Sequence, residues 1–183
     1  TISPHLDLDG DPDGIGKMMF SNCSLDAMEQ GIPQVYHPME ENPRVKSLKN
    51  KERFYRDREG NPVSKARLYQ LRDGIFEAVI DRFYRDPTLA AWGEENRDWG
   101  GACAVYRGLT EALPYHMLFN APRSEGAIVG TAIGYGRCGG RVRAEIMYCD
   151  FLGRSGDEVF NQLPKWQAMS GNLIRMPVVI RVS

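Results

Sequence analysis

One acidic side chain stands out among the residues that could do chemistry. Glu125 lies in the segment Pro122-Arg-Ser-Glu-Gly-Ala-Ile-Val-Gly130, where most of its neighbours are small or apolar. A lone carboxyl group in such a setting either pairs with a nearby cation or holds and donates a proton during catalysis. Arg123 is two residues away and could be that cation. From these residues alone, an ion pair between Glu125 and Arg123 is the simpler interpretation, and proton handling is the alternative.

The sequence pattern around Glu125 predicts alternating helices and strands. Apolar residues recur at helical spacing in four segments, and short apolar runs separate them. We expect a first helix that Ser64 caps and Asp86-Pro87 ends, followed by further helices over 102–113, 124–138 and 154–168. The predicted strands are 89–92, 117–119, 142–148 and 176–182. The last strand is a β-branched run typical of a buried parallel strand, and Pro164 should distort the helix before it.

This alternation predicts an α/β fold, a three-layer α/β/α arrangement with a mainly parallel sheet. Ligands of such sheets bind beyond the carboxyl ends of the strands. Suggestive residues follow three of the predicted strands: Glu94 and Glu95, then Ser124-Glu125, then Asp150 and Phe151. We therefore expect these three segments to gather along one edge of the sheet.

The first third of the chain differs from the rest. Residues 1–63 are rich in Pro, Asp, Asn and Lys and show little periodicity. We expect an irregular arm or inter-domain connector there, with one short helix near Cys23–Gln30, and a folded domain over 64–183. The acidic turn Asp9–Gly14 lacks the Glu that a calcium loop needs at its twelfth position, because Phe20 stands there.

Composition argues against several classes of protein. The 183 residues have a net charge of −1 with acids and bases interspersed, so nothing favours a nucleic-acid or membrane partner. No apolar run reaches the roughly 18–20 residues that cross a bilayer. The four cysteines lie far apart, which favours reduced thiols. The three histidines are scattered and show no metal-ligand spacing. We expect a cytoplasmic protein, or one of the mitochondrial matrix if the source is a eukaryote, without metal ligands of its own.

Residues 88–182 contain blocks that resemble one family. The blocks are Gly93-Glu-Glu-Asn-Arg-Asp-Trp-Gly-Gly-Ala102, Arg107-Gly-Leu-Thr-Glu111, the segment 119–134, Glu145-Ile-Met-Tyr-Cys-Asp-Phe151 and Met169-Ser-Gly171. Together with their spacing they resemble the pyrimidine-binding (transketolase-like) domain of thiamine-diphosphate enzymes. The closest resemblance is to the beta subunit of the decarboxylating component of 2-oxo-acid dehydrogenase complexes. Residues 1–63 look more like a connector in a chain that fuses the alpha and beta parts.

The resemblance implies roles for four residues. Glu125 matches the glutamate that hydrogen-bonds a ring nitrogen of the cofactor's aminopyrimidine and donates a proton to it. Glu94 matches an acid near the cofactor that takes part in proton communication, and Met147 and Phe151 match apolar residues that pack on the pyrimidine ring. Burial would favour the protonated form of Glu125, whereas a helix N-terminus would favour the anion. Arg123 departs from the small or apolar residue usual at its position, and contact with Glu125 would keep that acid ionised.

The resemblance also implies that this chain supplies only half of a site. The motif that holds Mg²⁺ and the diphosphate of thiamine diphosphate is absent, and in the family it lies on the alpha subunit or a separate diphosphate-binding domain. The ridge Gly126, Gly130 and Gly134 matches a helix that contacts a second beta-type chain, and a lipoyl-bearing acyltransferase is a further implied partner. The family continues past the last predicted strand, so we expect the domain to be truncated at its carboxyl end and inactive alone.

Three functions stay open. The first is a 2-oxo-acid dehydrogenase of the pyruvate, branched-chain or acetoin type, which couples oxidative decarboxylation to acyl transfer onto lipoyl groups. The second is a transketolase-type enzyme acting on sugar phosphates, for which convincing additional Arg and His residues are missing. The third is a non-catalytic assembly domain that shares the fold.

Overall fold

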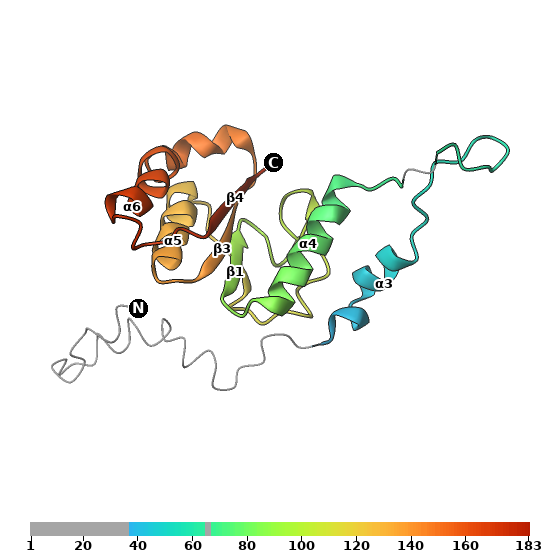
Figure 1. Ribbon diagram of the computed structural model, residues 1–183, viewed down its shortest axis with the longest axis horizontal. Helices are drawn as coiled ribbons and strands as arrows, with labels where there is room; N and C mark the ends of the chain where they lie inside the picture. The colour runs from blue at the N-terminus through green and yellow to red at the C-terminus, as the bar shows by residue number, and fades with distance from the viewer. Residues whose placement is uncertain (1–36, 65–66) are drawn as a thin grey trace.

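The computed structural model describes residues 37–64 and 67–183, and Figure 1 shows its elements along the chain. The predicted helix near Cys23–Gln30 and the turn Asp9–Gly14 lie outside the described residues. The helices are η4 (Met39–Glu41), α3 (Pro43–Lys49), α4 (Leu71–Arg85), η5 (Ala102–Ala104), α5 (Glu125–Arg137), η6 (Cys149–Ser155), η7 (Glu158–Gln162) and α6 (Leu163–Met169). The strands are β1 (Leu89–Gly93), β2 (Leu118–Asn120), β3 (Arg141–Ile146) and β4 (Val178–Val182).

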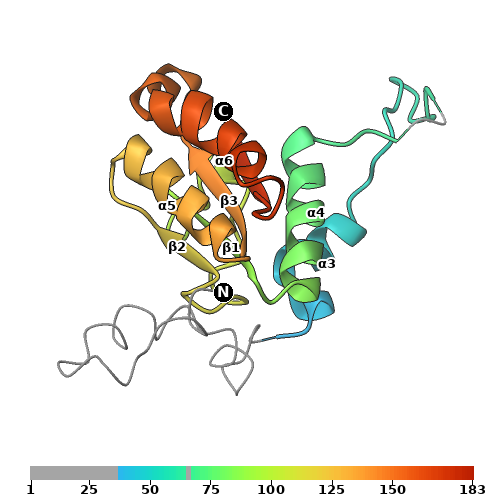
Figure 2. The same ribbon diagram turned by 60° about the vertical axis from the view of Figure 1, so that its left-hand side comes forward.

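The four strands form one parallel sheet in the order β2-β1-β3-β4. Figure 2 shows α3 and α4 on one side of this sheet, and α5 and α6 on the other. The predicted three-layer α/β/α fold is therefore confirmed. Each predicted strand is present near its expected position, and α5 begins and ends within one residue of its predicted bounds.

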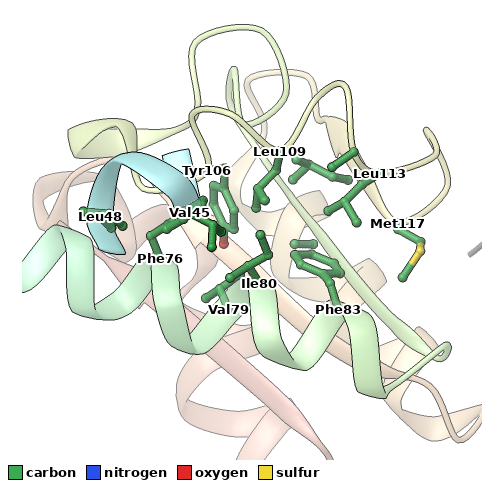
Figure 3. Packing of buried hydrophobic residues seen from close by; sticks show 13 residues of the cluster. Val45, Leu48, Phe76, Val79, Ile80, Phe83, Tyr106, Leu109, Leu113 and Met117 are labelled. Atoms are coloured by element: carbon green, nitrogen blue, oxygen red, sulfur yellow. The ribbon is translucent and has the colours of Figure 1, made fainter. Parts of the chain in front are cut away.

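The first core lies between α4 and the sheet. Phe76, Val79, Ile80 and Phe83 recur at helical spacing on α4 and are all buried. Figure 3 shows this row facing Leu109 and the other apolar residues of the segment between β1 and β2. The same cluster includes Ala91 of β1 and Leu118 of β2.

The second core lies between the sheet and α5. Trp92 of β1 stacks on Phe119 of β2 with ring centroids 5.2 Å apart, and its indole N–H donates to the carbonyl of Ile128 at 3.1 Å. Val129 and Ile133 on α5 are buried against the same face of the sheet. These contacts fix α5, and thus Glu125 at its first turn, relative to the strand ends.

The segment 39–49 is helical, which differs from the irregular arm that we expected over 1–63. The Asn42 side chain accepts hydrogen bonds from the N–H groups of Arg44 and Val45, and it donates to the carbonyl of Gly108 at 2.6 Å. Asn as N-cap followed directly by Pro43 is a helix-start signal. Val45 and the other apolar residue of α3, Leu48, are buried in the first core.

Arg44 ties α3 to the rest of the domain. One terminal nitrogen of its guanidinium donates to the carbonyls of Ala104, Val105 and Arg107 at 2.8–3.0 Å. Its guanidinium carbon lies 3.9 Å from the ring centroid of Phe76 on α4. The irregular character expected of the arm is seen only after α3, over 51–64, where an isolated bridge joins Arg56 and Pro62.

Two predicted helices are shorter than expected. The first begins at Leu71 rather than Ser64, and the Leu71 side chain is 81% exposed. The helix predicted over 102–113 is wrong: the structure has only the short turn η5 followed by further turns. Cys103 and Gly108 both have positive φ, a backbone conformation that an α-helix cannot contain.

Pro164 distorts its helix as predicted. The π turn η7 ends one residue before α6, and Pro164 occupies the first turn of α6. Proline is tolerated at this position because the N–H groups of a first turn have no partner within the helix.

Membrane-spanning helices and metal-ligand groups were sought in the described residues. Over 37–64 and 67–183, no helix combines the length and apolar character needed to cross a membrane. In the same residues, His, Cys, Asp and Glu side chains form no group of three that could hold a metal ion.

Asp73→Asn should destabilise the domain at neutral pH. A hydrogen bond from Lys51 (2.7 Å) lowers the pKa of Asp73, and Arg44 contributes from 3.5 Å. A carboxyl group with a lowered folded-state pKa stabilises above its unfolded pKa and loses that effect as the pH falls through the folded pKa. We expect a loss of about 1–2 kcal/mol at neutral pH.

Urea unfolding at several pH values checks this. The difference between Asp73→Asn and the parent should shrink as the solution is acidified, because protonated Asp73 resembles Asn. Asp81→Asn, in an exposed pair with Arg85 on the same helix, should change little. A pH-independent difference would show that the charge of Asp73 is not what matters.

Candidate functional site

The carboxyl ends of the strands bring the three predicted segments together. In the strand register, Gly93 of β1 lies opposite both Asn120 of β2 and Glu145 of β3. The three segments that follow β1, β2 and β3 therefore leave the sheet side by side. They carry Glu94, Glu125 and Met147, respectively. The structure bears out the predicted convergence of these loops.

Glu125 is the first residue of α5, and its side chain is only 8% exposed. Its Oε2 lies 3.2 Å from Nε of Arg154, whose own side chain is 74% exposed. Ser124, at the N-cap, makes no side-chain capping bond. Glu125 is thus held in place by its burial, while its counter-ion lies on the solvent side.

The expected ion pair between Glu125 and Arg123 is wrong. Arg123 is 84% exposed and lies toward the neighbouring loop, where its Nε is 3.8 Å from Oε2 of Glu94. The reason is the path of η6, which crosses the first turn of α5. A Cβ built on Gly126 would lie 3.5 Å from the carbonyl oxygen of Arg154. The backbone of η6 therefore brings Arg154 within reach of Glu125.

Glu94 is largely buried and belongs to a well-anchored loop. The backbone N–H of Arg97 donates to the side chain of Asn120 at 2.8 Å, and the Arg97 guanidinium donates to the carbonyls of Thr110, Leu113 and Leu118. These bonds fix the loop after β1 to the ends of β2. Glu94 is accordingly held at a defined distance from the start of α5.

The two predicted apolar site residues lie after β3. Met147 is half-buried, and Phe151 in η6 is 39% exposed and meets Tyr148 edge to face, with ring centroids 5.9 Å apart. Glu95 and Asp150, which the sequence also placed at this edge, are exposed. The edge therefore carries two partly buried acids beside accessible apolar surface.

A buried ion pair that we did not predict supports the same loops. Glu145 of β3 is 1% exposed and pairs with Arg181 of β4. Glu145 accepts a hydrogen bond from the N–H of Ala102 at 2.6 Å, and Arg181 donates to the carbonyl of Ala102 at 3.0 Å. Burial raises the pKa of Glu145, and the charge of Arg181 opposes that effect. In the sequence, this pair is visible only as an acid, Glu145, in one predicted strand and a base, Arg181, in another.

Close packing accompanies this pair. A Cβ on Gly93 would lie 2.7 Å from the carbonyl oxygen of Glu145, and one on Gly101 would clash with its carboxylate. The side-chain amide of Asn96 lies between these glycines, and within the described residues neither its nitrogen nor its oxygen has a hydrogen-bond partner. Glycine is therefore required at both positions for the loop to reach the sheet.

A pocket of about 630 Å³ lies beside α5, away from the two acids. Aromatic residues of the sheet side, Trp92 and Phe119, line it together with the small residues of one face of α5, including Gly134. Gly126 and Gly130 lie instead alongside Glu158, whose side-chain atoms would be 3.6–3.7 Å from a Cβ at either position. Only the last member of the predicted glycine ridge therefore faces open space.

The fold and this edge define an α/β ligand-binding domain with a buried acid at the start of a helix. Comparison with known proteins identifies its relatives. The chain is 39% identical over 126 residues to the acetoin:2,6-dichlorophenolindophenol oxidoreductase subunit beta of Cupriavidus necator, covering 63% of this chain and 37% of that protein. No protein-family model matches the chain.

Pyruvate dehydrogenase subunits match as well. The chain is 32% identical over 143 residues to the pyruvate dehydrogenase E1 component subunit beta of Leifsonia xyli, covering 78% of this chain and 36% of that protein. It is 32% identical over 111 residues to the human mitochondrial E1 component subunit beta, covering 61% and 31%. The chain is homologous to the beta subunits of these thiamine-diphosphate-dependent dehydrogenases, which confirms the resemblance. It spans about a third of their length.

Proposed function

We propose that this chain supplies the pyrimidine half of a thiamine-diphosphate site in a dehydrogenase of the acetoin, pyruvate or branched-chain 2-oxo-acid type, with Glu125 as its catalytic acid. The single observation that carries the proposal is the buried carboxyl group of Glu125 at the first turn of α5, on the sheet edge where the loops after three strands meet. The homology to dehydrogenase beta subunits supports the same assignment.

The residues at this edge fit the ring of the cofactor. Glu125 offers one carboxyl group, and Met147 and Phe151 offer apolar surface nearby in the chain that follows β3. Within the described residues there is no group of acids that could hold Mg²⁺. From the resemblance to this family, we assign the diphosphate and Mg²⁺ to an alpha subunit or a diphosphate-binding domain.

Glu125 has one chemical task in this proposal. Thiamine diphosphate, when bound, supplies a carbanion equivalent that adds to a keto group. Glu125 holds a proton at its carboxyl group and donates it to a ring nitrogen of the aminopyrimidine. Its burial protects that exchange from water. Glu94 stays a proposed second proton carrier, because its loop holds it largely buried and close to the approach to α5.

The remaining partners follow from the homology. Oxidative decarboxylation by such a beta subunit would pass an acyl group to the lipoyl group of an acyltransferase, and we propose that the full protein does the same. A reducing compartment, the cytoplasm or the mitochondrial matrix, suits the exposed free thiols of Cys103, Cys138 and Cys149.

A non-catalytic assembly domain is the second candidate, and the ion pair between Glu125 and Arg154 favours it. Turnover decides between the two. The full protein, reconstituted with its partner, should oxidise acetoin, pyruvate or a branched-chain 2-oxo acid with an artificial electron acceptor, and Glu125→Gln should lower that turnover by about 10²–10⁴-fold. Turnover of a ketose phosphate alone would assign the protein to the transketolase type instead.

We also propose that a second beta-type chain packs on α5. Of the three glycines of the ridge, only Gly134 is placed to make this contact. Gly126 and Gly130 lie alongside Glu158, whereas Gly134 lines the apolar pocket, and a Cβ added to it would meet no atom of the described residues within 4 Å. Small residues along a helix let a partner helix approach closely. The contact would then run over the pocket side of α5.

Gly134→Leu should dissociate that contact without harming the domain. Among residues 37–64 and 67–183, the Cβ of a residue at this position meets no atom within 4 Å, and replacing a glycine inside a helix adds helix propensity of about 0.5–1 kcal/mol. We expect the oligomer to shift toward smaller species in light scattering. Gly74→Leu is the matched control, because Gly74 lies inside α4 and also has open space around it. Unchanged mass for Gly134→Leu would place the partner elsewhere.

A further inference from the structure

The two side chains of the ion pair between Glu125 and Arg154 differ greatly in solvent exposure, which suggests that the Arg154 side chain can move. The acid is fixed on α5 with 8% of its side chain exposed, whereas Arg154 has 74% of its side chain in solvent. The closest approach between them is from Nε of the guanidinium to the carboxylate, at 3.2 Å. Rotation of the Arg154 side chain would therefore uncover Glu125 without moving either backbone.

A second carboxylate is close to the same point. Glu158 is four residues beyond Arg154, and its Oε1 lies 3.6 Å from a Cβ built on Gly126. The carbonyl oxygen of Arg154 lies 3.5 Å from the same position. The side chain of Arg154 thus contacts the buried Glu125, while its backbone and the half-buried side chain of Glu158 both adjoin Gly126 in the first turn of α5.

We propose that Arg154 is a positioning residue that acts through Glu125: it covers the carboxylate while the site is empty and transfers to Glu158 when an aminopyrimidine ring takes its place. This inference rests on the proposed function. An ionised Glu125 paired with a guanidinium cannot donate a proton to a ring nitrogen, so the pair must open before Glu125 can act. Breaking the ion pair between Arg154 and Glu125 lowers the affinity for the cofactor. Glu158 reduces this loss by forming a new ion pair with the displaced guanidinium of Arg154.

Cofactor affinity tests the proposal without relying on turnover. Thiamine diphosphate with Mg²⁺ is titrated into the full protein, reconstituted with its partner, by calorimetry. Arg154→Gln should tighten binding about three- to fivefold, because an exposed ion pair no longer has to be broken. Arg85→Gln is the matched control: Arg85 is 71% exposed and uses Nε on Asp81 at 2.9 Å, on the distant helix α4. It should leave the affinity unchanged.

Glu158→Gln provides the complementary test. It should weaken binding severalfold when Arg154 is present and have no effect in the Arg154→Gln background. Such an interaction between two substitutions would not arise if each side chain merely supported the fold. Thermal unfolding of the variants confirms that they are folded, which the exposure of Arg154 leads us to expect.

The outcomes separate this inference from the proposed function. If Glu125→Gln leaves both affinity and turnover unchanged, the proposed function is wrong. If Glu125→Gln impairs turnover while Arg154→Gln binds like Arg85→Gln, the proposed function stands and the role of Arg154 is wrong. Weaker binding by Arg154→Gln would also overturn it, because Arg154 would then be helping to hold the ring.

Discussion

Glu125→Gln is expected to lower turnover of the reconstituted protein by about 10²–10⁴-fold, the range typical of losing a positioned general acid. Glutamine keeps the size of the side chain and its hydrogen-bonding atoms but has no acidic proton to donate. Burial keeps the substituted side chain in the same place, since α5 is anchored by its packing on the sheet. Steady-state rates with acetoin and with 2-oxo acids measure the effect.

Measurements of stability show whether a loss of turnover in Glu125→Gln comes from lost proton transfer or from a damaged fold. Glu125→Gln breaks a pair whose basic partner is largely exposed, so the free energy of unfolding should change by no more than about 1 kcal/mol. Glu111→Gln, an exposed acid on the connection to β2, is the control and should retain full turnover. A loss of turnover shared by both variants would point to damaged assembly rather than to proton transfer.

Arg181→Met should destabilise the domain by about 3–5 kcal/mol at neutral pH, because it leaves the buried carboxylate of Glu145 without its cation. Burial already raises the pKa of Glu145. An acid with a raised folded-state pKa adds stability below its unfolded pKa and loses it as the pH rises through the folded pKa. The defect of Arg181→Met should therefore be smaller in mildly acidic solution than at neutral pH. Chemical denaturation across this range provides the measurement.

The double variant Arg181→Met with Glu145→Gln separates charge from packing. Neutral groups at both positions remove the uncompensated charge, so much of the lost stability should return. Arg141→Met breaks a half-exposed pair with Asp86 and should cost about 1 kcal/mol or less. If the double variant were as unstable as Arg181→Met, lost packing around Ala102 would be the main cause of the instability.

Topology made the location of the site predictable. Alternating strand and helix signals imply a parallel sheet, and the carboxyl ends of parallel strands share one edge, so Glu94 and Glu125 had to come close. Helix α5 was equally clear because Ser124 and Gly139 flank a run of helix-compatible residues. Neither prediction needed any knowledge of side-chain contacts.

Side-chain partners were less predictable, for physical reasons. Arg123 is nearer to Glu125 in sequence, yet Arg154 pairs with it, because η6 folds back over α5 through turns with no repeating pattern. The helix expected over 102–113 fails at residues whose positive φ the apolar spacing does not reveal. Asn42-Pro43 is a helix-start signal that lies in a segment rich in turn formers, and we missed it.

The outer edge of β4 has a practical consequence. Within the described residues β4 pairs with β3 alone, and Val179 exposes 59% of its surface beside that open edge. Unsatisfied strand edges rich in β-branched residues invite other strands to add to them. This chain on its own will therefore tend to aggregate, and precipitation during purification would reflect the unpaired edge of β4 rather than a defect at Glu125.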